Sequence, residues 1–508
     1  MAIVVSHIAD DFEVLAAQAL RQAPLADLIE LRLDRIGHPG EDRLARFFAE
    51  SPKPVIIACH ESDHPNAWDG DIDQRLDLLH DAARLGAKLV DVDWRLSMDL
   101  GEVDAPSHRI VSRHFTGGVP EELDDLLEEQ QEVLYEGDVT KLVAHANRLE
   151  EGLRLLNWLR TTKGIVSFAS GEAGKLTRLL CPVFGSPFTY CAPAVMPGEE
   201  PPEKTAEGQW RVNDLMGQLP PGGISQETAI FGIVGNPVGT SYSPFVQGMA
   251  MKAAKLDCVY VRFEPESFDE FFELVQDENY RGFSVTAPFK QDAYRRASVH
   301  EGAAEATKAV NTLVRDQGRW RGANSDVPAV RRTLERALEF HAQKGGQPGV
   351  LRDAVVVVIG AGGAARAAIH AAKTADARVT VAARHAERGR ALAEEFGVAS
   401  IALGDLGDLA YDVLVHATPA GSAAQPDQLV VPIEHLRPGA VVLDAVYHPI
   451  RTPLLLAAHE RGLTAVPGGE WFVGQAGQQF QWWTHQDPDE SLMRSAFEHA
   501  HTSFQAED

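Results

Sequence analysis

The sequence predicts an α/β protein in which an N-terminal (β/α)8 barrel is followed by a two-lobed unit ending in a doubly wound nucleotide-binding domain. Three observations predict this. Eight short apolar runs alternate with helix-forming stretches over the first 210 residues, Pro- and Gly-rich segments punctuate the chain, and an apolar strand near residue 355 leads into a glycine-rich turn. At 508 residues, the chain is long enough for two or three domains.

The expected barrel strands are the β-branched, apolar runs of the first half. Between most of them, apolar residues recur at helical spacing, as at Leu78, Ala82 and Leu85. A closed barrel is the economical architecture for this alternation. The expected strands are residues 2–6, 27–33, 54–59, 88–93, 109–113, 139–143, 164–168 and 188–191.

The composition limits the classes of partner. The chain has 47 basic and 73 acidic residues and a formal net charge of -26, which repels phosphate backbones and anionic lipid surfaces. No run approaches the roughly 18 to 20 apolar residues of a membrane span. We therefore expect no nucleic-acid partner and no membrane partner. An anionic small-molecule substrate would need local Arg and Lys side chains.

The ends and the cysteines bear on location. The chain begins MAIVVS, which is typical of a strand and not of a secretory or transit segment. Its four cysteines have no CxxC spacing and lie in apolar runs, as buried free thiols of a reducing compartment do. We expect a cytoplasmic protein, and the oligomeric state is unknown from sequence.

Two breaks divide the chain into domains. LPPGGISQET is dense in Pro and Gly without an apolar period, and HAQKGGQPGVLRD precedes the strand AVVVVIG. The expected organisation is a barrel at 1–218, a linker at 219–228, a substrate-binding lobe at 229–340, a nucleotide-binding domain at 341–480 and a C-terminal segment at 481–508 that returns to the substrate lobe.

Polar residues close several expected barrel strands, where a β/α barrel places its reactive groups. Lys141 lies in VTKLV. Pointing inward it would be a desolvated amine able to attack a ketone, and pointing outward it would snorkel between helices. His114 closes RIVSRH as a titratable base or a core histidine. His60 and His64 have a spacing that suits a metal, but no third ligand follows, so no metal is expected. The strand-closing set is Glu30, Arg32, His60, Asp93, His114 and Lys141.

The first half resembles the type I 3-dehydroquinate dehydratases. The resemblance rests on IELRLD, VSRHF, TKLV, LTRLLCPVFGSPFTY and TAEGQWRVNDL, in that order. It implies that Lys141 forms an imine with the C3 ketone of the substrate, and that His114 removes the C2 proton and helps water to leave. The residues implied to hold the substrate hydroxyls and carboxylate are Ser6, Glu30, Arg32, Arg178, Thr205 and Gln209.

Two positions depart from that family. His60 stands where the family usually has Arg, and Thr205 stands where it has Ser. We expect His60 to face the substrate. Unlike the guanidinium of Arg, its imidazole is charged only when protonated and cannot bind a carboxylate through two parallel N–H groups.

A glycine turn follows the strand AVVVVIG and precedes a helix-forming stretch. Such a turn lets backbone N–H groups approach a pyrophosphate at the positive end of the helix. The next strand ends at Arg384, where an NAD-preferring domain has an acid, so we expect NADP; a solvated surface arginine is the alternative. The expected cofactor contacts are Gly360, Ala361, Gly362, Gly363, Ala364, Arg384, His385, Arg388, Thr418, Ala445 and Gly468.

Four further segments of the second half resemble the shikimate dehydrogenases as a set, although each alone could be a turn or a helix cap. They are GNPVGTSYSPF, FSVTAPFKQDA, KAVNTL with GANSD, and GGEWFVGQA, within residues 229–500. The resemblance implies that Lys290 and Asp326 form the acid/base pair at the reacting C3 oxygen and that NADPH supplies the hydride. The residues implied to bind substrate are Ser241, Ser243, Thr286, Asn311, Tyr447 and Gln475.

Three positions depart from the second family. Ser325 replaces the usual Thr, Ala383 the usual Asn and His385 the usual Thr. The last two bear on cofactor selectivity and not on the fold.

Together the resemblances imply consecutive reactions of the shikimate pathway, because the product of the first is the substrate of the second. 3-Dehydroquinate would be dehydrated to 3-dehydroshikimate, which would then be reduced to shikimate. Two alternatives remain. The second half could oxidise quinate or shikimate with NAD. Alternatively, the barrel could be a non-catalytic binding module, and His60 in place of the usual Arg would then indicate that dehydratase activity has been lost.

Overall fold

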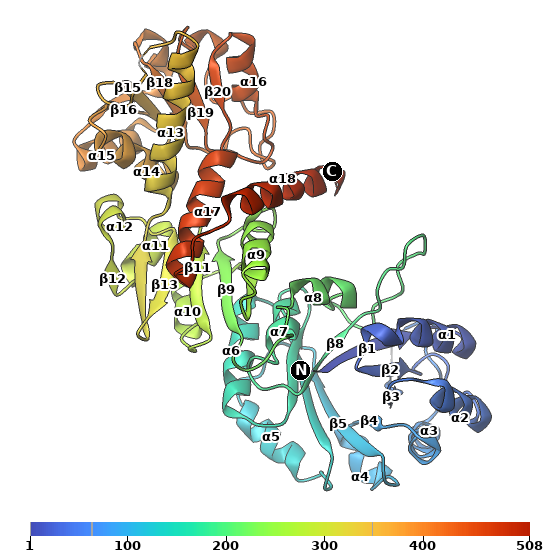
Figure 1. The fold of residues 1–508 in the computed structure, drawn as a ribbon. Helices are drawn as coiled ribbons and strands as arrows, with labels where there is room; N and C mark the ends of the chain where they lie inside the picture. Colours follow the sequence, from blue (N-terminus) through green and yellow to red (C-terminus); the bar gives the residue numbers. More distant parts are fainter. Residues whose placement is uncertain (1, 62–63, 348, 508) are drawn as a thin grey trace. The chain divides into compact units, whose positions relative to one another are not determined.

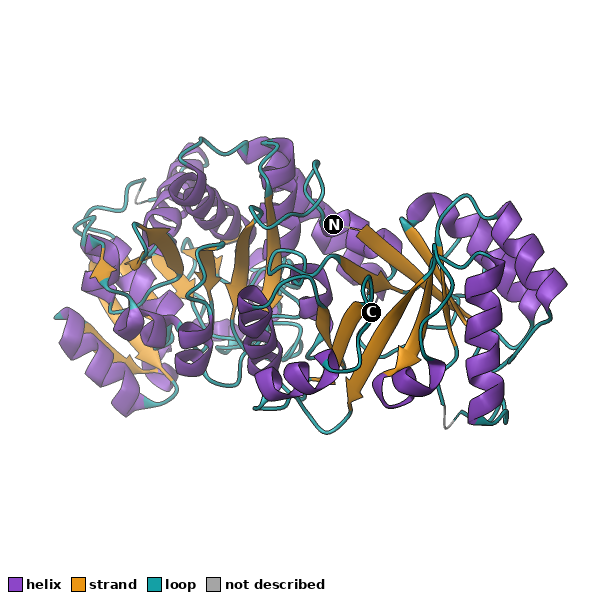
Figure 2. Cartoon of the chain, turned by 90° about the horizontal axis from the view of Figure 1, so that it is seen from below, coloured by secondary structure: helices purple, strands orange, loops and turns teal. Residues whose placement is uncertain are grey.

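A computed structural model describes residues 2–61, 64–347 and 349–507. The chain divides into two compact units: the first runs to Ala229 and adds residues 257–259 and 265–279, and the second contains the remainder. In each unit helices pack around the strands (Figure 2). No helix within the described ranges is both long and apolar enough to cross a bilayer.

The first unit is built on eight parallel strands that alternate with helices (Figure 1). Hydrogen bonding follows the order β7-β6-β5-β4-β3-β2-β1-β8, so β7 and β8 end a nearly closed barrel. All eight expected strands are present. They are β1 (Ala2–Ile8), β2 (Leu28–Arg32), β3 (Val55–Ala58), β4 (Leu89–Asp93), β5 (His108–Phe115), β6 (Val139–His145), β7 (Val166–Ser170) and β8 (Phe188–Cys191).

The helices of this unit follow the expected capping chemistry. Asp71 caps α3 by accepting the backbone N–H of Gln74, whose side chain accepts the N–H of Asp71 in return. The helices are α1 (Phe12–Gln22), η1 (Ala23–Leu25), α2 (Glu41–Glu50), α3 (Ile72–Leu85), η2 (Trp94–Leu96), α4 (Ser97–Leu100), α5 (Leu123–Gln131), α6 (Leu149–Thr161), α7 (Lys175–Leu180) and α8 (Val212–Gln218).

The barrel strands are buried on both faces, because helices cover the outside and side chains fill the inside. Ile29 and Leu31 on β2 are fully buried, and Glu30 between them is 2% exposed and lines the inner cavity. Because successive side chains of a strand point to opposite faces, polar side chains of neighbouring strands lie together inside the barrel. The expected linker is itself packed, since Ile224 and Thr228 are buried.

A mixed six-stranded sheet follows, in the order β10-β9-β11-β13-β14-β12. β9 and β11 are parallel, and β13 is antiparallel to both β11 and β14. The elements are β9 (Ala229–Val234), α9 (Ser243–Ala253), β10 (Cys258–Phe263), α10 (Phe268–Leu274), β11 (Tyr280–Val285), α11 (Lys290–Arg296), β12 (Val299–His300), α12 (Gly302–Thr307), β13 (Thr312–Asp316) and β14 (Arg319–Ala323).

The last sheet is fully parallel and doubly wound, in the order β17-β16-β15-β18-β19-β20. Alternate residues of β15 enter two cores on opposite faces: Val356 and Val358 pack in one, Val357 and Ile359 in the other. The elements are α13 (Asp326–Gln343), β15 (Val355–Ile359), α14 (Gly363–Lys373), β16 (Arg378–Ala383), α15 (Ala386–Phe396), β17 (Ala399–Ala402), η3 (Leu403–Asp408), β18 (Val413–His416), η4 (Ile433–His435), β19 (Val441–Asp444), α16 (Pro453–Glu460) and β20 (Thr464–Val466).

Two C-terminal helices connect this sheet to the preceding one. α17 (Gly469–Thr484) packs against α13 and α9, and α18 (Glu490–Glu507) packs against α9 and α17 (Figure 1). The last helices of the chain therefore pack beside α9, the helix that follows the first strand of the mixed sheet.

Candidate active sites

The barrel holds an ion pair between Lys141 on β6 and Asp91 on β4. Lys141 is 5% exposed, and its Nζ lies 2.5 Å from Asp91 Oδ2 and 4.6 Å from the ring centroid of Tyr190. Burial opposes ionisation of Asp91, but the charges of Lys141 and His60 and the hydrogen bond from Lys141 prevail and lower its pKa to about 2. The Lys141 side chain therefore points into the barrel, where its partner is a carboxylate and not the apolar side chains of the strands.

Two imidazoles flank this ion pair. His60 Nε2 lies 3.7 Å from Asp91 Oδ1, and the rings of His60 and His114 are 5.6 Å apart. Burial lowers the pKa of both histidines, and for His114 the charges of Lys141 and His60 lower it further. Both rings are thus neutral near pH 7 and able to accept a proton. His114 keeps more than a third of its surface accessible from the cavity.

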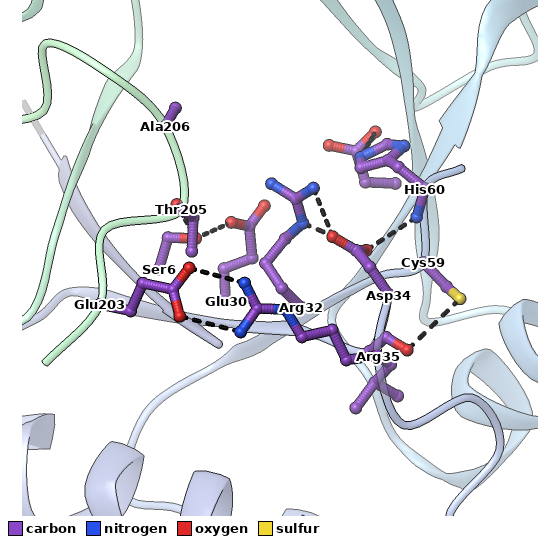
Figure 3. Close-up of polar contacts among 12 residues, drawn as sticks. Ser6, Glu30, Arg32, Asp34, Arg35, Cys59, His60, Glu203, Thr205 and Ala206 are labelled. Atoms are coloured by element: carbon purple, nitrogen blue, oxygen red, sulfur yellow. Dashed lines mark hydrogen bonds and ion pairs between the residues drawn. The ribbon is translucent and has the colours of Figure 1, made fainter. Parts of the chain in front are cut away.

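A chain of hydroxyl and amide groups joins the loop before α8 to β1 and β2. Ser6 donates to the Glu30 carboxylate, and Thr205 Oγ1 donates to Ser6 Oγ at 2.9 Å (Figure 3). Gln209 Nε2 donates to Thr205 Oγ1 at 2.9 Å. The same loop is held by Glu203, which pairs with Arg35 at 2.6 Å. These contacts bring four of the expected substrate-binding residues together.

Two arginines supply positive charge to the cavity. Arg32 Nη2 lies 2.6 Å from Asp34 Oδ2, and Asp34 Oδ1 accepts the backbone N–H of His60 at 2.8 Å (Figure 3). Arg178 is 2% exposed, stacks over Phe168 at 4.3 Å, and its Nε has no hydrogen-bond partner within the described residues. Burial lowers the pKa of Arg178 to about 10. A buried guanidinium without a counter-charge on one edge attracts an anion such as a carboxylate.

Most of these side chains line one cavity of about 1610 Å³. Sequence reasoning placed most of the lining residues but missed Asp91 and Tyr190, and it also missed Asp34, the partner of Arg32. The expected strand-closing acid, Asp93, also lines this cavity, and its carboxylate accepts hydrogen bonds from Arg95. The expected site residues that line the cavity are Glu30, Arg32, His60, His114, Lys141, Arg178, Thr205 and Gln209.

The His60–His64 spacing considered above for a metal lies after β3. His64 Nδ1 accepts the backbone N–H of Asn66 at 3.1 Å. No group of three His, Cys, Asp or Glu side chains that could hold a metal occurs in the part of the chain that the structure describes.

The second unit has its own lysine–carboxylate pair. Lys290 begins α11 and Asp326 begins α13, and Nζ lies 2.6 Å from Asp326 Oδ2. The other carboxylate oxygen, Oδ1, accepts Trp471 Nε1 at 3.2 Å. Both oxygens of Asp326 are thus occupied by donors, which fixes its orientation. Trp471 lies within GGEWFVGQA, but sequence reasoning did not identify it as a partner of Asp326.

The expected substrate-binding residues of this unit fall into two groups. Asn311 Nδ2 donates to Ser325 Oγ at 2.9 Å, and Ser325 Oγ donates to Gln475 Oε1 at 3.4 Å. Ser241 Oγ lies 3.2 Å from Ser243 Oγ at the start of α9. Gln479, which sequence reasoning missed, donates to Asn311 O and accepts from Ser284.

Tyr447 and Thr286 complete that set. The Tyr447 ring packs 5.3 Å from Tyr242 and 4.6 Å from Phe472, and burial raises the pKa of its phenol although a hydrogen bond with Ser241 opposes the rise. Thr286 follows β11, and its backbone N–H donates to Val234 O at 2.9 Å. Tyr447 therefore packs on Tyr242, the residue between the two serines, and Thr286 is anchored to the end of β9.

The glycine turn after β15 is closely packed against its neighbours. Gly360 has φ +128, and a Cβ there would lie 2.6 Å from Ala417 O and 3.2 Å from Thr418 Cγ2. A Cβ on Gly363 would lie 2.7 Å from Lys290 Cδ, so the turn adjoins the lysine–carboxylate pair. Gly362, Ala361 and Ala364 belong to this turn or to the first turn of α14.

The basic residues after β16 lie at the surface. Arg384, His385 and Arg388 are all exposed, as a phosphate-binding cluster must be, and Ala383 ends the strand in place of an acid. Gly468, which follows β20, lies against the end of β19: a Cβ on Gly468 would lie 2.7 Å from Ala445 O. The expected cofactor contacts thus follow the carboxyl ends of β15, β16, β18, β19 and β20.

The fold and the two sites define an enzyme with two active sites on one chain: a β/α barrel with a buried lysine, and a dinucleotide-dependent dehydrogenase. The model of the type I 3-dehydroquinase family matches residues 3–220. The models of the shikimate dehydrogenase substrate binding domain and of shikimate/quinate 5-dehydrogenase match 233–313 and 327–438.

Curated relatives agree with this division. The chain is 31% identical over 498 residues to the "Bifunctional 3-dehydroquinate dehydratase/shikimate dehydrogenase, chloroplastic" of Arabidopsis thaliana, covering 94% of this chain and 81% of the relative. It is 34% identical to a "Shikimate dehydrogenase (NADP(+))" of Syntrophobacter fumaroxidans, covering 51% of this chain and 87% of the relative. A protein of the same name from Halorubrum lacusprofundi is 39% identical, over 53% of this chain and 97% of its own. The chain therefore belongs to the family of bifunctional 3-dehydroquinate dehydratase/shikimate dehydrogenases.

Proposed function

We propose that Lys141 and His114 are the reacting groups of the first active site and that Lys290 and Asp326 are those of the second. As a member of its family, the chain dehydrates 3-dehydroquinate to 3-dehydroshikimate and reduces 3-dehydroshikimate to shikimate with NADPH. The assignment rests on the buried Lys141 amine beside the His60 and His114 rings, and on the 2.6 Å contact between Lys290 and Asp326.

In the barrel, the Lys141 amine adds to the C3 ketone and releases water as the imine forms. The imine draws electrons from C2, so His114 can take a C2 proton while the C1 hydroxyl leaves as water, and hydrolysis then frees Lys141. Asp91 stabilises the positive charge of Lys141 before attack. The ammonium must give up one proton, which a neutral imidazole beside the pair can take, before its amine adds to the ketone. Arg178 is the cation placed to hold the substrate carboxylate, because its buried Nε has no hydrogen-bond partner among the described residues.

In the second unit, NADPH supplies the hydride to the C3 carbonyl when it is bound. Lys290 donates a proton to the developing alkoxide, and Asp326 holds the Lys290 ammonium in place and charged. Trp471 fixes the orientation of Asp326 through Oδ1. Ser241, Asn311 and the other residues of the substrate set orient the ring.

A cytoplasmic location is part of the proposal. All four cysteines are free and buried, which is typical of proteins in a reducing compartment. The Arabidopsis relative is named as chloroplastic.

Borohydride trapping tests the imine. Reduction of the C=N bond during turnover of 3-dehydroquinate should attach the substrate skeleton to Lys141, as mapped by mass spectrometry. Lys141→Arg should give no adduct, and Lys175→Arg, which changes a partly exposed lysine of α7 that pairs with Glu172, should still be labelled at Lys141. An active dehydratase that is labelled elsewhere or not at all would overturn the assignment of Lys141.

A further inference from the structure

A fully buried imidazole–carboxylate pair lies at the carboxyl end of the nucleotide-binding sheet, outside the residues assigned above. His416 ends β18 and Asp444 ends β19, opposite each other in the strand register. Both side chains are 0% exposed, and His416 Nδ1 lies 2.8 Å from Asp444 Oδ1. A buried polar pair adds less stability than apolar packing would, so its position calls for a functional explanation.

The surroundings of Asp444 fix the tautomer of His416. Asp444 Oδ2 accepts the Thr452 hydroxyl at 2.6 Å, and Oδ1 also accepts the backbone N–H of Val446 at 3.0 Å. A carboxylate only accepts, so His416 Nδ1 carries the proton. In the neutral imidazole, Nε2 is then an acceptor.

That acceptor sets the direction of the Thr418 hydroxyl. His416 Nε2 lies 2.5 Å from Thr418 Oγ1, so Thr418 donates its proton inward to the ring. The backbone N–H of Ala420 donates to the same oxygen at 3.3 Å. Thr418 is partly exposed, whereas His416 and Asp444 are enclosed. The network therefore presents a threonine oxygen with its remaining lone pair available as an acceptor.

Thr418 stands at the point where a doubly wound sheet binds its ligand. The strand order reverses between β15 and β18, and ligands bind outside the carboxyl ends of the strands at that point. Thr418 Cγ2 would lie 3.2 Å from a Cβ on Gly360. Arg384 marks the adenosine side at β16, so the β18 side faces the other half of the dinucleotide, near Lys290.

We propose that His416 and Asp444 are positioning residues that hold the Thr418 hydroxyl as a hydrogen-bond acceptor for the nicotinamide half of NADPH. That half carries suitable donors, the ribose hydroxyls and the carboxamide N–H groups. A pyrophosphate, which carries no donors, would not be favoured by this oxygen. The inference rests on the cofactor site proposed above.

Fluorescence titration of NADPH without substrate tests the contact in the full chain. Thr418→Val removes the hydroxyl and keeps the shape, so NADPH should bind about two- to tenfold more weakly, the range for one hydrogen bond. Adenosine 2′,5′-bisphosphate, which lacks the nicotinamide half, should bind as tightly as to wild type. Thr418→Ser should recover most of the affinity. Thr374→Val, a helix-end threonine that bonds only its own helix, should change nothing.

His416→Asn tests the relay. An asparagine amide can still donate to Asp444 but does not reach Thr418, so the NADPH loss should equal that of Thr418→Val. The double variant should lose no more than either single variant, because both changes remove one interaction. Rates of 3-dehydroquinate dehydration at the barrel report the concentration of intact chain, and circular dichroism reports whether the second unit is folded.

Three results would overturn the proposal: unchanged NADPH affinity in Thr418→Val, additive losses in the double variant, or an equal loss for adenosine 2′,5′-bisphosphate. If His416→Asn proves unfolded by circular dichroism, the Thr418→Val and Thr418→Ser pair still decides whether the hydroxyl contacts the nicotinamide half. A wild-type chain that binds no NADPH would contradict the cofactor site itself, which is a different outcome.

Discussion

The amine of Lys141 lies 2.5 Å from the carboxylate of Asp91, and both groups are enclosed by the barrel. Removing one partner of a buried pair leaves an uncompensated charge, which costs about 3 to 5 kcal/mol. Lys141→Met should therefore destabilise β4 and β6, measured as lost protection of their peptides in hydrogen–deuterium exchange.

Adding Asp91→Leu to Lys141→Met should restore most of that protection, since no buried charge remains unpaired. Both variants should lack dehydratase activity, so the comparison isolates the energy of the pair from catalysis. A double variant as unprotected as Lys141→Met would show that packing, and not charge, holds these strands.

Trp471 donates to the carboxylate that holds Lys290, at 3.2 Å from Asp326 Oδ1. A hydrogen bond to a charged group contributes roughly 1.5 to 3 kcal/mol, so Trp471→Phe should lower kcat for shikimate oxidation by about ten- to a hundredfold. The matched control is Trp483→Phe, which removes an indole donor to Leu313 O in the same unit. Equal losses in both variants would mean that Trp471 acts through packing alone.

Arg384 is exposed after β16, where the adenosine ribose of the cofactor would lie. Charge-assisted bonds to a 2′-phosphate are worth roughly 1.5 to 3 kcal/mol, so Arg384→Ala should raise KM for NADPH about ten- to a hundredfold and leave KM for NADH nearly unchanged. Arg390→Ala, an exposed arginine on the adjoining helix, should affect neither. Parallel losses with both cofactors would contradict recognition of the phosphate by Arg384.

His7 on β1 makes the barrel sensitive to acid. Burial lowers the pKa of His7 from 6.5 to about 4, and neither ring nitrogen has a hydrogen-bond partner among the described residues. Between these values the unfolded chain binds the proton and the folded chain does not, so stability falls as the pH drops from 6.5 toward 4, by roughly 3 kcal/mol at most.

His7→Leu should flatten this part of the stability profile, seen as a smaller shift of the barrel's urea midpoint between pH 7 and pH 4.5. The same change at His80, which is exposed on α3, provides the control and should keep the wild-type profile. An unchanged profile in His7→Leu would assign the acid sensitivity to other groups.

The strands and the glycine turn could be predicted because their signals are local. Periods of two and 3.6 residues place β2 and α3, and the turn at Gly360 lies between an apolar strand and a helix in the sequence itself. The same local patterns indicated which residues close each strand.

The partners of those residues could not be predicted in this way. Asp91 and Asp93 are two positions apart on β4, so their side chains point to the same face of the strand. Their spacing therefore does not reveal which carboxylate lies far enough inside the barrel to reach Lys141. Trp471 and Asp326 are separated by 145 positions, and His416 and Asp444 by 28. Their contacts depend on how distant elements pack, which no local period encodes.

One measurement tests the central claim that the chain carries two independent active sites. Wild-type protein, Lys141→Ala and Lys290→Ala are each supplied with 3-dehydroquinate and NADPH, and alkene formation and NADPH consumption are followed together. Loss of a positioned proton donor costs about 10² to 10⁴ in rate, so Lys290→Ala should accumulate 3-dehydroshikimate with little NADPH oxidation. Lys141→Ala should leave NADPH unconsumed until 3-dehydroshikimate is added. If either substitution silenced both reactions in protein that circular dichroism shows to be folded, the two sites could not be independent.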